Sequence, residues 1–272
     1  NIKGITYKSV NGRLVSNPDR ELIENLNLLP MMERKFIDMG LYKKINSDAL
    51  SFAKKTPVVS IMTSRGCPYN CIFCSTKIMW KRNWRPRNPE NVIKEIEYLI
   101  NEYSIREIAI QDDQFVIDKK RVHDICDLII SKKLNISLSI PSGTSIWLID
   151  FELLKKMKKA GFYRLCFPVE TGNQNTLKFI RKPVNLAKVK ETIKMANKLG
   201  FWTQGNFIIG FPYETKEEIE ETIKYAYNSG LDYVFFFVAK HYAGSEMYEI
   251  FKEEALLNTI VRSSHIERSD YD

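Results

Sequence analysis

The 272-residue chain is 44% apolar and carries 41 basic and 33 acidic side chains, for a net charge of +8. This length can bury the core of one large domain, the composition excludes wholesale disorder, and no run of about 18 uncharged apolar residues predicts a membrane span. The five cysteines, three of them bunched together, do not form the pattern of a secreted disulfide framework, and no signal peptide precedes them. We therefore expect a protein of the reducing cytoplasm, and the first residue, Asn1, indicates a piece of a longer chain.

Residues 1–56 stand apart from the repeating pattern that follows them. Two short runs, residues 5–8 and 13–15, flank Asn11-Gly12, a dipeptide that suits the type I′ turn of a β-hairpin. We expect this part of the chain to be an N-terminal extension or linker.

From residue 57 onward, apolar runs alternate with helical patterns. A capping residue precedes several amphipathic stretches, as at Asn88, Asp118, Asp150 and, through a capping box with Glu218, at Thr215. Between these helices lie six predicted strands, over residues 58–62, 107–111, 136–140, 163–169, 203–209 and 233–238. Six β–α units in succession predict a parallel α/β sheet with its helices outside, short of the eight units of a closed barrel.

Three of the five cysteines, Cys67, Cys71 and Cys74, follow the first predicted strand at a C-x3-C-x2-C spacing. Three thiolates in one loop can hold a metal cluster, but the next cysteine is Cys126. Iron–sulfur cubanes are usually held by four thiolates, one per iron, so a site with three leaves one iron open to a further ligand. A zinc knuckle or a redox-active thiol cluster is the alternative, although zinc would need a fourth ligand from far away in the sequence.

This spacing, with the aromatic Phe73 before the last cysteine, resembles the signature of the radical S-adenosylmethionine (SAM) superfamily. The resemblance implies a partial (β/α)6 barrel of the TIM type, with the core over residues 57–257 and a C-terminal tail over residues 258–272. It implies that the three cysteines hold a [4Fe–4S] cluster, whose open iron SAM chelates through its amino and carboxylate groups. It further implies that SAM is cleaved reductively to a 5′-deoxyadenosyl radical, which takes hydrogen from a substrate.

Further motifs that resemble those of the family follow at strand ends, where ligands bind in parallel α/β barrels. Asp112 and Asp113 resemble a DDxF motif in which one aspartate accepts a hydrogen bond from the SAM amino group; capping of the next helix is the alternative. Glu170 resembles a glutamate that helps to hold SAM, with a surface role as the alternative. The fifth strand resembles the family's glycine-bearing strand, with simple packing as the alternative. By this resemblance, the remaining residues that contact the cofactor are Phe73, Asn206, Ile208 and Gly210.

Residues 1–30 resemble the exit from a cobalamin-binding domain into a radical SAM core. Cobalamin is therefore expected only if a domain that binds it precedes Asn1. In that branch of the superfamily, methylation of an unactivated carbon in a small-molecule or peptide substrate is the leading expectation, with rearrangement or cyclisation next. A flavodoxin or ferredoxin is expected as the electron donor.

Two other functions stay open. A tRNA methylthiotransferase resembles this core, but no cysteine precedes Cys67 and only a short tail follows the predicted barrel. The second is a metal-cluster module that binds nucleic acid through a basic patch with interleaved tryptophans. One short patch is weak evidence, so we do not expect nucleic acid as a partner. The patch consists of Lys77, Trp80, Lys81, Arg82, Trp84, Arg85 and Arg87.

Overall fold

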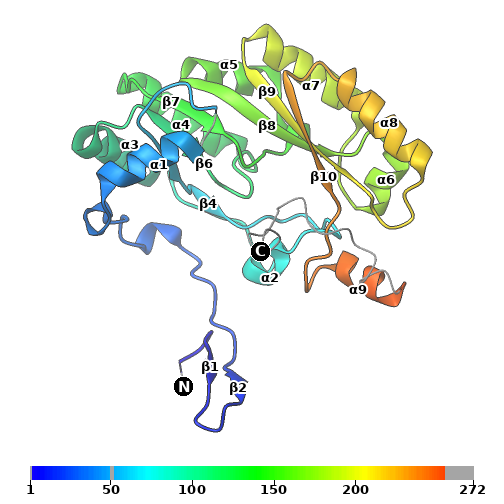
Figure 1. The fold of residues 1–272 in the computed structure, drawn as a ribbon. Helices are drawn as coiled ribbons and strands as arrows, with labels where there is room; N and C mark the ends of the chain where they lie inside the picture. Colours follow the sequence, from blue (N-terminus) through cyan, green and yellow to red (C-terminus); the bar gives the residue numbers. More distant parts are fainter. Residues whose placement is uncertain (1, 50–51, 255–272) are drawn as a thin grey trace.

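A computed structural model describes residues 2–49 and 52–254, so the predicted tail over residues 258–272 lies outside the described residues. Six strands form one sheet in the order β10–β9–β8–β7–β6–β3, and every neighbouring pair is parallel (Figure 1). The six predicted strands are confirmed to within one residue at either end. They are β3 (Val58–Ile61), β6 (Glu107–Ile110), β7 (Ser137–Ile140), β8 (Phe162–Glu170), β9 (Trp202–Ile209) and β10 (Tyr233–Val238).

Five helices cover the outer face of this curved sheet, and the structure has the form of an arch (Figure 1). They are α3 (Pro89–Tyr103), α4 (Lys119–Ser131), α5 (Phe151–Lys159), α7 (Leu186–Lys198) and α8 (Lys216–Tyr227). The predicted caps are confirmed, because Asn88, Asp118 and Asp150 each accept a hydrogen bond from a first-turn N–H, and Thr215 forms the capping box with Glu218. These side chains satisfy N–H groups that have no partner within the helix.

The sheet does not close, and the predicted partial barrel is confirmed. Among the described residues, no strand pairs with the outer edge of β3 or of β10. The edge of β3 is covered by the N-terminal segment, since the Arg34 guanidinium donates a hydrogen bond to the Ser60 carbonyl at 3.3 Å. In contrast, β10 exposes Phe236 and Phe237. The carboxyl ends of all six strands lie on the lower side of Figure 1, toward the segment between β4 and α2.

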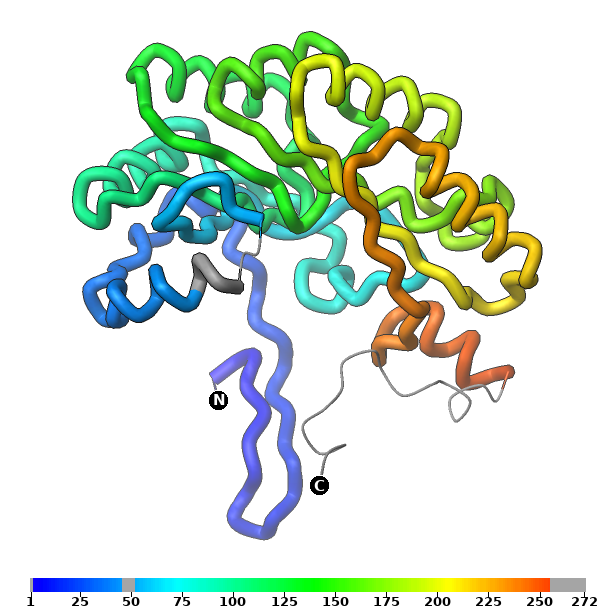
Figure 2. The backbone as a smooth tube through the Cα atoms, turned by 45° about the horizontal axis from the view of Figure 1, so that its top comes forward, coloured from blue at the N-terminus to red at the C-terminus, as the bar shows by residue number. Residues whose placement is uncertain are grey.

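The N-terminal hairpin consists of β1 (Thr6–Lys8) and β2 (Leu14–Ser16), and it stands away from the sheet (Figure 2). The hairpin was predicted correctly, but its turn was not. A type I′ turn needs a positive φ at both central residues, and Asn11 has none. The Gly12 N–H instead donates to the Ser9 carbonyl at 2.9 Å, and the Ser9 N–H donates to the Arg13 carbonyl at 2.8 Å, so the connection is longer than two residues.

Several short elements were not predicted. The helix α1 (Met39–Ala49) packs beside β3, inside the segment that was expected to be a linker. The others carry too few turns to show a hydrophobic period in the sequence. They are η1 (Leu26–Leu28), η2 (Arg34–Phe36), β4 (Ser64–Arg65), α2 (Thr76–Trp80), β5 (Arg85–Pro86), η3 (Ile146–Leu148) and α6 (Gln174–Phe179). The last helix of the described chain is α9 (Glu246–Glu253). Within the described part of the chain, no helix has both the length and the apolar character needed to cross a bilayer.

Candidate functional site

The three clustered cysteines lie on the loop between β4 and α2, beside the carboxyl ends of the strands (Figure 1). All three are partly exposed, and all five cysteines of the chain are free thiols. The loop is tied to two other elements through Ile72, whose N–H donates to the Ile180 carbonyl and whose carbonyl accepts from the Met247 N–H. These backbone bonds bring the end of α6 and the start of α9 against the cysteine loop.

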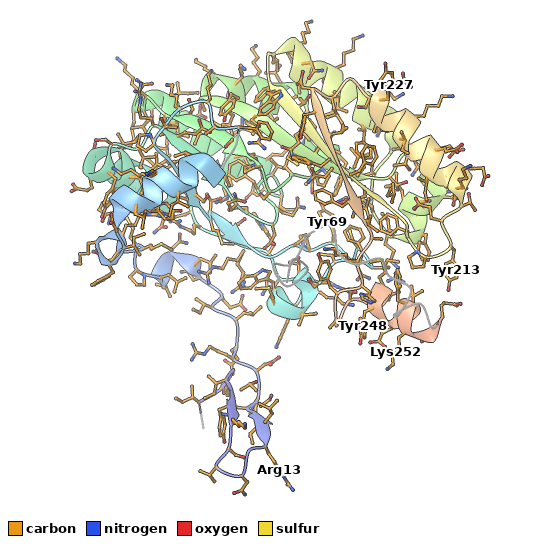
Figure 3. All side chains as sticks on the ribbon, viewed as in Figure 1. Arg13, Tyr69, Tyr213, Tyr227, Tyr248 and Lys252 are labelled. Atoms are coloured by element: carbon orange, nitrogen blue, oxygen red, sulfur yellow. The ribbon has the colours of Figure 1, made fainter. Side chains whose placement is uncertain are left out.

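Tyr69, between the first two cysteines, braces the same loop. Its ring packs edge-on against Trp147, with 5.0 Å between ring centroids, and the Trp147 Nε1 donates a hydrogen bond to its hydroxyl at 3.2 Å. In Figure 3, Tyr69 lies between the sheet and α2. This pair was not predicted, because an aromatic residue on a loop gives no signal of its partner.

The donor set fits a cluster better than a single ion. Within residues 2–49 and 52–254, no three Cys, His, Asp or Glu side chains converge closely enough to hold one metal ion. A mononuclear zinc site needs four ligands around one point, whereas in a cubane each thiolate binds a different iron. Burial raises the pKa of Cys67, and it raises that of Cys71 to about 11 against the attraction of the Lys182 ammonium.

The two aspartates after β6 differ in their surroundings. Asp112 is fully buried, and its carboxylate accepts hydrogen bonds from the Thr63 N–H at 2.5 Å, the Thr63 hydroxyl at 2.6 Å and the Ser64 hydroxyl at 2.6 Å. Burial raises the pKa of Asp112 although these bonds oppose the shift. Asp113 is partly exposed, and its Oδ2 accepts from the Gly66 N–H at 2.9 Å. Asp112 thus fixes the strand that leads to the cysteines, and Asp113 Oδ1 has no hydrogen-bond donor among the residues that the structure describes.

Glu170 lies at the end of β8 and forms a buried ion pair with Lys182, at 2.7 Å between Oε1 and Nζ. The surface alternative for Glu170 is therefore wrong, since its side chain is only 7% exposed. Burial alone would lower the pKa of Lys182, but Glu170 and the nearby thiols of Cys71 and Cys67 raise it. Glu170 itself has a φ of +73°, at the point where the register between β8 and β9 shifts.

Lys182 was missed by the sequence analysis. It follows α6 in a chain rich in surface lysines, so nothing in the sequence distinguishes a buried lysine from an exposed one. Its ammonium also lies 5.5 Å from the centroid of the Trp147 ring. The tie between Ile72 and Ile180 brings this region to the cysteine loop.

A pocket of about 340 Å³ opens on the other side of Cys74. Phe73 and Ile208, both predicted cofactor residues, line it together with Phe211 and Phe237. The rings of Phe73 and Phe211 lie 5.9 Å apart. The predicted residue Gly210 lies at the end of β9 with a φ of +80°, and its N–H donates to the Glu214 carboxylate at 2.5 Å.

Asn206 is the remaining predicted cofactor residue. It lies on β9 two residues before Ile208, is half-buried, and accepts a hydrogen bond from Gln204 at 3.0 Å. It is not part of the lining of the 340 Å³ pocket. The structure therefore gathers Cys74, Phe73 and Ile208 around one pocket and sets Asn206 one position deeper in the arch.

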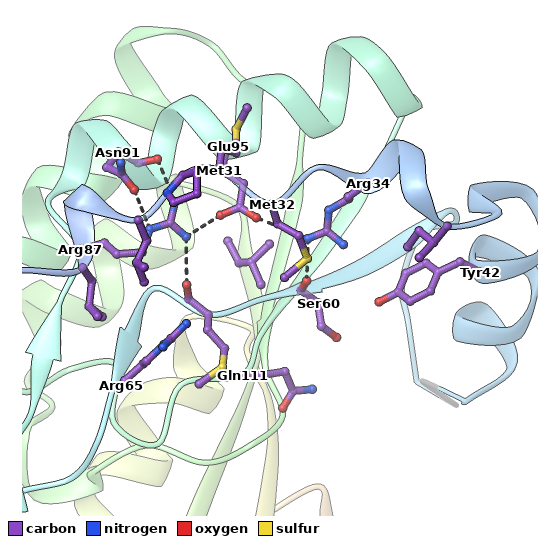
Figure 4. Close-up of a pocket in the computed structure, with 16 residues that line it drawn as sticks. Met31, Met32, Arg34, Tyr42, Ser60, Arg65, Arg87, Asn91, Glu95 and Gln111 are labelled. Carbon is purple, nitrogen blue, oxygen red and sulfur yellow. Dashed lines mark hydrogen bonds and ion pairs between the residues drawn. The ribbon is translucent and has the colours of Figure 1, made fainter. Parts of the chain in front are cut away.

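The basic patch after the cysteines is largely used inside the protein. Arg85 is buried, donates to the Ile23 carbonyl at 2.6 Å and stacks on Trp80 at 5.3 Å. Arg87 pairs with Glu95 at 2.5 Å beside a second cavity, of about 320 Å³, between the N-terminal segment and β3 (Figure 4). These contacts anchor the segment and leave fewer cations to meet a nucleic acid.

The model of the radical SAM superfamily matches residues 61–226, which contain the cysteine loop, both aspartates, Glu170 and Asn206. The chain belongs to the radical SAM superfamily. Its family and its fold were both predicted correctly, and the family implies a [4Fe–4S] cluster and SAM as cofactors.

Two curated relatives of this radical SAM chain carry methyltransferase names. It is 36% identical to the uncharacterized methyltransferase PH0819 of Pyrococcus horikoshii, over 95% of its own length and 54% of the relative's. It is 33% identical to the cytidylyl-2-hydroxyethylphosphonate methyltransferase of Streptomyces wedmorensis, over 85% of its length and 44% of the relative's. The chain thus spans about half the length of the curated relatives it matches.

Among solved structures, the radical SAM chain is similar to the methyltransferase TsrM from Kitasatospora setae, determined with cobalamin and a [4Fe–4S] cluster bound. The TM-score is 0.67 at 16% identity, and the match covers 76% of this chain and 41% of that one. At this identity the likeness is evidence for the fold alone.

Proposed function

We propose that this chain is the catalytic core of a cobalamin-dependent radical SAM methyltransferase, which methylates an unactivated carbon of a small-molecule or peptide substrate. One observation carries the proposal: three free thiols on one loop lie between a buried Glu170–Lys182 pair and a largely apolar pocket. The names of the two curated relatives support methyl transfer as the outcome.

The cysteines fit a [4Fe–4S] cluster, with Cys67, Cys71 and Cys74 as its ligands and one iron left for SAM. When bound and reduced, the cluster would supply one electron to the SAM sulfonium, the chemistry by which SAM is cleaved to methionine and a 5′-deoxyadenosyl radical. The protein's part is to bind, orient and exclude water, as is usual for cofactor enzymes.

Charged groups around the loop match the charges of SAM. The Lys182 ammonium lies beside the thiols and suits both the negative charge of the cluster and the SAM carboxylate. Asp113, with Oδ1 available, suits the SAM amino group. We assign Asp112 the supporting role of holding Thr63 and Ser64, because its oxygens already accept three hydrogen bonds.

The pocket beside Cys74 suits the adenosyl group. Phe73, Ile208 and Phe211 give it apolar walls, which exclude water from the place where the radical would form. Gly210 leaves room for backbone to approach the adenine, since a Cβ added there would have no closer neighbour than 3.8 Å and the position needs a positive φ.

The remaining parts of the reaction lie with partners of this core. Cobalamin would be held by a part of the full protein beyond this chain, in keeping with the greater length of its relatives. A flavodoxin or ferredoxin would deliver the electron, and three free thiols of this kind need the reducing conditions of the cytoplasm.

Anaerobic reconstitution with iron and sulfide tests the proposal. We expect a brown protein with charge-transfer absorbance near roughly 400 nm that converts SAM to 5′-deoxyadenosine when dithionite is added. Cys71→Ala should lose both the cluster and the cleavage. Cys126→Ala is the matched control, because Cys126 is a fully buried residue of α4, outside the cysteine loop, and its variant should keep both. A colourless protein that binds one zinc ion, or a Cys71→Ala variant that still cleaves SAM, would contradict the proposal.

A further inference from the structure

The inner face of the arch carries a line of polar side chains beneath the proposed SAM site. On β8, Arg164 and Cys166 face the inside, and in the parallel register Cys166 lies opposite Gln204 of β9, with Pro168 opposite Asn206. Arg164 and Gln204 are only 7% and 4% exposed. Among the described residues neither belongs to an ion pair.

Three of these side chains form a directed chain of hydrogen bonds. The Arg164 Nη2 donates to the Gln204 Oε1 at 2.6 Å, and the Gln204 Nε2 donates to the Asn206 Oδ1 at 3.0 Å. The Gln204 Nε2 also lies 3.5 Å from the Cys166 Sγ, which accepts from it. A guanidinium has only donors, so the atom of Gln204 that meets it must be the carbonyl oxygen. The orientation of one amide therefore decides the orientation of the next.

Arg164, the first donor in this series of hydrogen bonds, is held by two aromatic rings. The guanidinium of Arg164 lies against the rings of Phe52 and Trp202, at 5.2 and 5.0 Å from their centroids. These rings also contact each other edge-on at 5.0 Å, near the amino ends of β8 and β9. Arg164 cannot turn away without leaving both rings, which makes it a fixed starting point for the polarity of the chain.

Asn206 stands at the open end. Its carbonyl oxygen is occupied by Gln204, and no acceptor for its Nδ2 exists among the described residues. The bond from Gln204 therefore sets the orientation of the amide, and the two N–H donors on Nδ2 point away from Gln204. Asn206 lies one inward-facing position, about 7 Å along the strand, below Ile208, which lines the pocket beside Cys74.

We propose that Arg164 and Gln204 are positioning residues that hold Asn206 with its Nδ2 donors toward the adenosyl part of SAM, at a ribose oxygen or a ring nitrogen. This rests on the proposed function, because it takes the pocket beside Cys74 as the adenosyl site. Asn206 would reject a donor at this point of the ligand, since a buried donor facing Nδ2 would be left without a partner. Arg164 and Gln204 touch neither cofactor nor substrate and act only through Asn206.

The substitution Gln204→Glu should reverse the orientation of the Asn206 amide, because glutamate has almost the same shape as glutamine but no N–H donor. A glutamate keeps the bond to Arg164, but it cannot donate, so the amide of Asn206 turns its Nδ2 toward the new carboxylate and its oxygen toward the ligand. In the reconstituted protein, equilibrium dialysis should show 5′-deoxyadenosine and SAM binding about tenfold more weakly, the size of one hydrogen bond sheltered from water. Binding of methionine, which lacks the adenosyl group, should not change.

Two further variants separate positioning from a general loss of structure. Asn206→Ala should weaken 5′-deoxyadenosine binding to a similar extent, and Gln204→Glu added to it should have no further effect, because both act through the same contact. Gln204→Met should give a smaller loss, since it frees Asn206 without reversing it. Arg164→Met, which releases Gln204, should do the same.

Each result of these binding measurements either supports or overturns the inference. A tenfold loss for 5′-deoxyadenosine with methionine unchanged, absent in the Asn206→Ala background, supports the inference. Unchanged binding of 5′-deoxyadenosine in Gln204→Glu, or an equal loss in both backgrounds, overturns it while leaving the proposed function intact. If the unsubstituted protein binds neither SAM nor 5′-deoxyadenosine, the proposed function fails and the inference falls with it. Should Gln204→Glu not fold, Gln204→Met and Asn206→Ala carry the same comparison.

Discussion

Two sets of strand ends meet at the cysteine loop, and the buried carboxylate at each is satisfied by a different kind of partner. At the β3–β6 end, the buried carboxylate of Asp112 is satisfied by a backbone N–H and two hydroxyl groups. At the β8–β9 end, the buried carboxylate of Glu170 is satisfied by the ammonium of Lys182. The donors around Asp112 are neutral and hold a strand in place, whereas the Glu170–Lys182 pair sets an ammonium near the thiols of Cys71 and Cys67, where a charged cofactor is proposed. Asp112 is therefore a support, and the Glu170–Lys182 pair is suited to bind a charged group.

The largest effect is expected from Gly66→Ala at the β3–β6 end. Gly66 has a φ of +92°, and an added Cβ would overlap the backbone carbonyl of Asn83, which cannot move aside as a flexible side chain could. We expect the free energy of unfolding to fall by at least about 3 kcal/mol, together with loss of the cysteine loop's geometry. Urea denaturation and the iron content after reconstitution measure the two effects. A variant with normal stability and iron content would mean that the loop is looser than the contacts with Asn83 indicate.

The next effect is expected from Lys182→Met at the β8–β9 end. Removal of the ammonium leaves the Glu170 carboxylate buried without a partner, and we expect the free energy of unfolding to fall by about 3 kcal/mol. The double variant Lys182→Met/Glu170→Gln should recover much of this loss, because it removes the unpaired charge. Urea denaturation of all variants completes the cycle. If the double variant is no more stable than Lys182→Met, the two residues are not coupled as their 2.7 Å contact indicates.

A smaller effect is expected from Asp112→Ala. The loss leaves donors of Thr63 and Ser64 without their acceptor, which we expect to lower the free energy of unfolding by about 2 kcal/mol. Because burial raises the pKa of Asp112, the folded protein holds this proton more tightly than the unfolded chain does. The contribution of Asp112 therefore decreases as the pH rises from its ordinary pKa through the raised one, and the gap between the two proteins should narrow over that range.

Urea denaturation between about pH 4 and pH 7, bracketing the ordinary pKa of an aspartate and values above it, measures this gap. Asp113→Ala is the matched control from the same end, because Asp113 is partly exposed and accepts one hydrogen bond. It should show a smaller loss of stability than Asp112→Ala at every pH. A gap for Asp112→Ala that widens with rising pH would contradict the assignment.

The smallest effect is expected from Gly210→Ala. Like Gly66, this residue has a positive φ, of +80°, but an added Cβ would meet nothing closer than the Val238 Cγ1 at 3.8 Å. Only backbone strain remains, so we expect a loss of about 1 kcal/mol in the free energy of unfolding. The pair of glycine variants separates steric overlap from strain, and equal losses in the two would show that the overlap at Gly66 is relieved elsewhere.

The sequence predicted the fold well because its signals are local. Each strand is an apolar run that ends at polar residues, and each long helix begins at a side chain that caps it, as at Asn88 and Thr215. The short helix α6 escaped prediction because it offers less than two turns of pattern. The hairpin turn was misjudged because Asn-Gly is compatible with more than one loop length.

The candidate site was predicted only where its residues lie close together in the sequence. The cysteine motif can be recognised from its spacing, but the burial of Lys182 depends on how α6 packs against the loop. The difference between Asp112 and Asp113 depends likewise on Thr63 and Ser64, which lie more than 40 residues away along the chain. The hydrogen bonds from Arg164 to Asn206 depend on how β8 and β9 are aligned, and a sequence motif does not predict that alignment.

The left-handed backbone of Glu170 has a further consequence. This conformation disfavours any residue with a Cβ, by about 1 kcal/mol or more, and is free for glycine. A library screened for heat resistance alone should therefore enrich variants in which glycine replaces Glu170 and an uncharged residue replaces Lys182. Such variants should bind the cofactor more weakly. The residue at position 170 therefore tests whether a homologous chain has been selected for catalytic activity or for thermal stability.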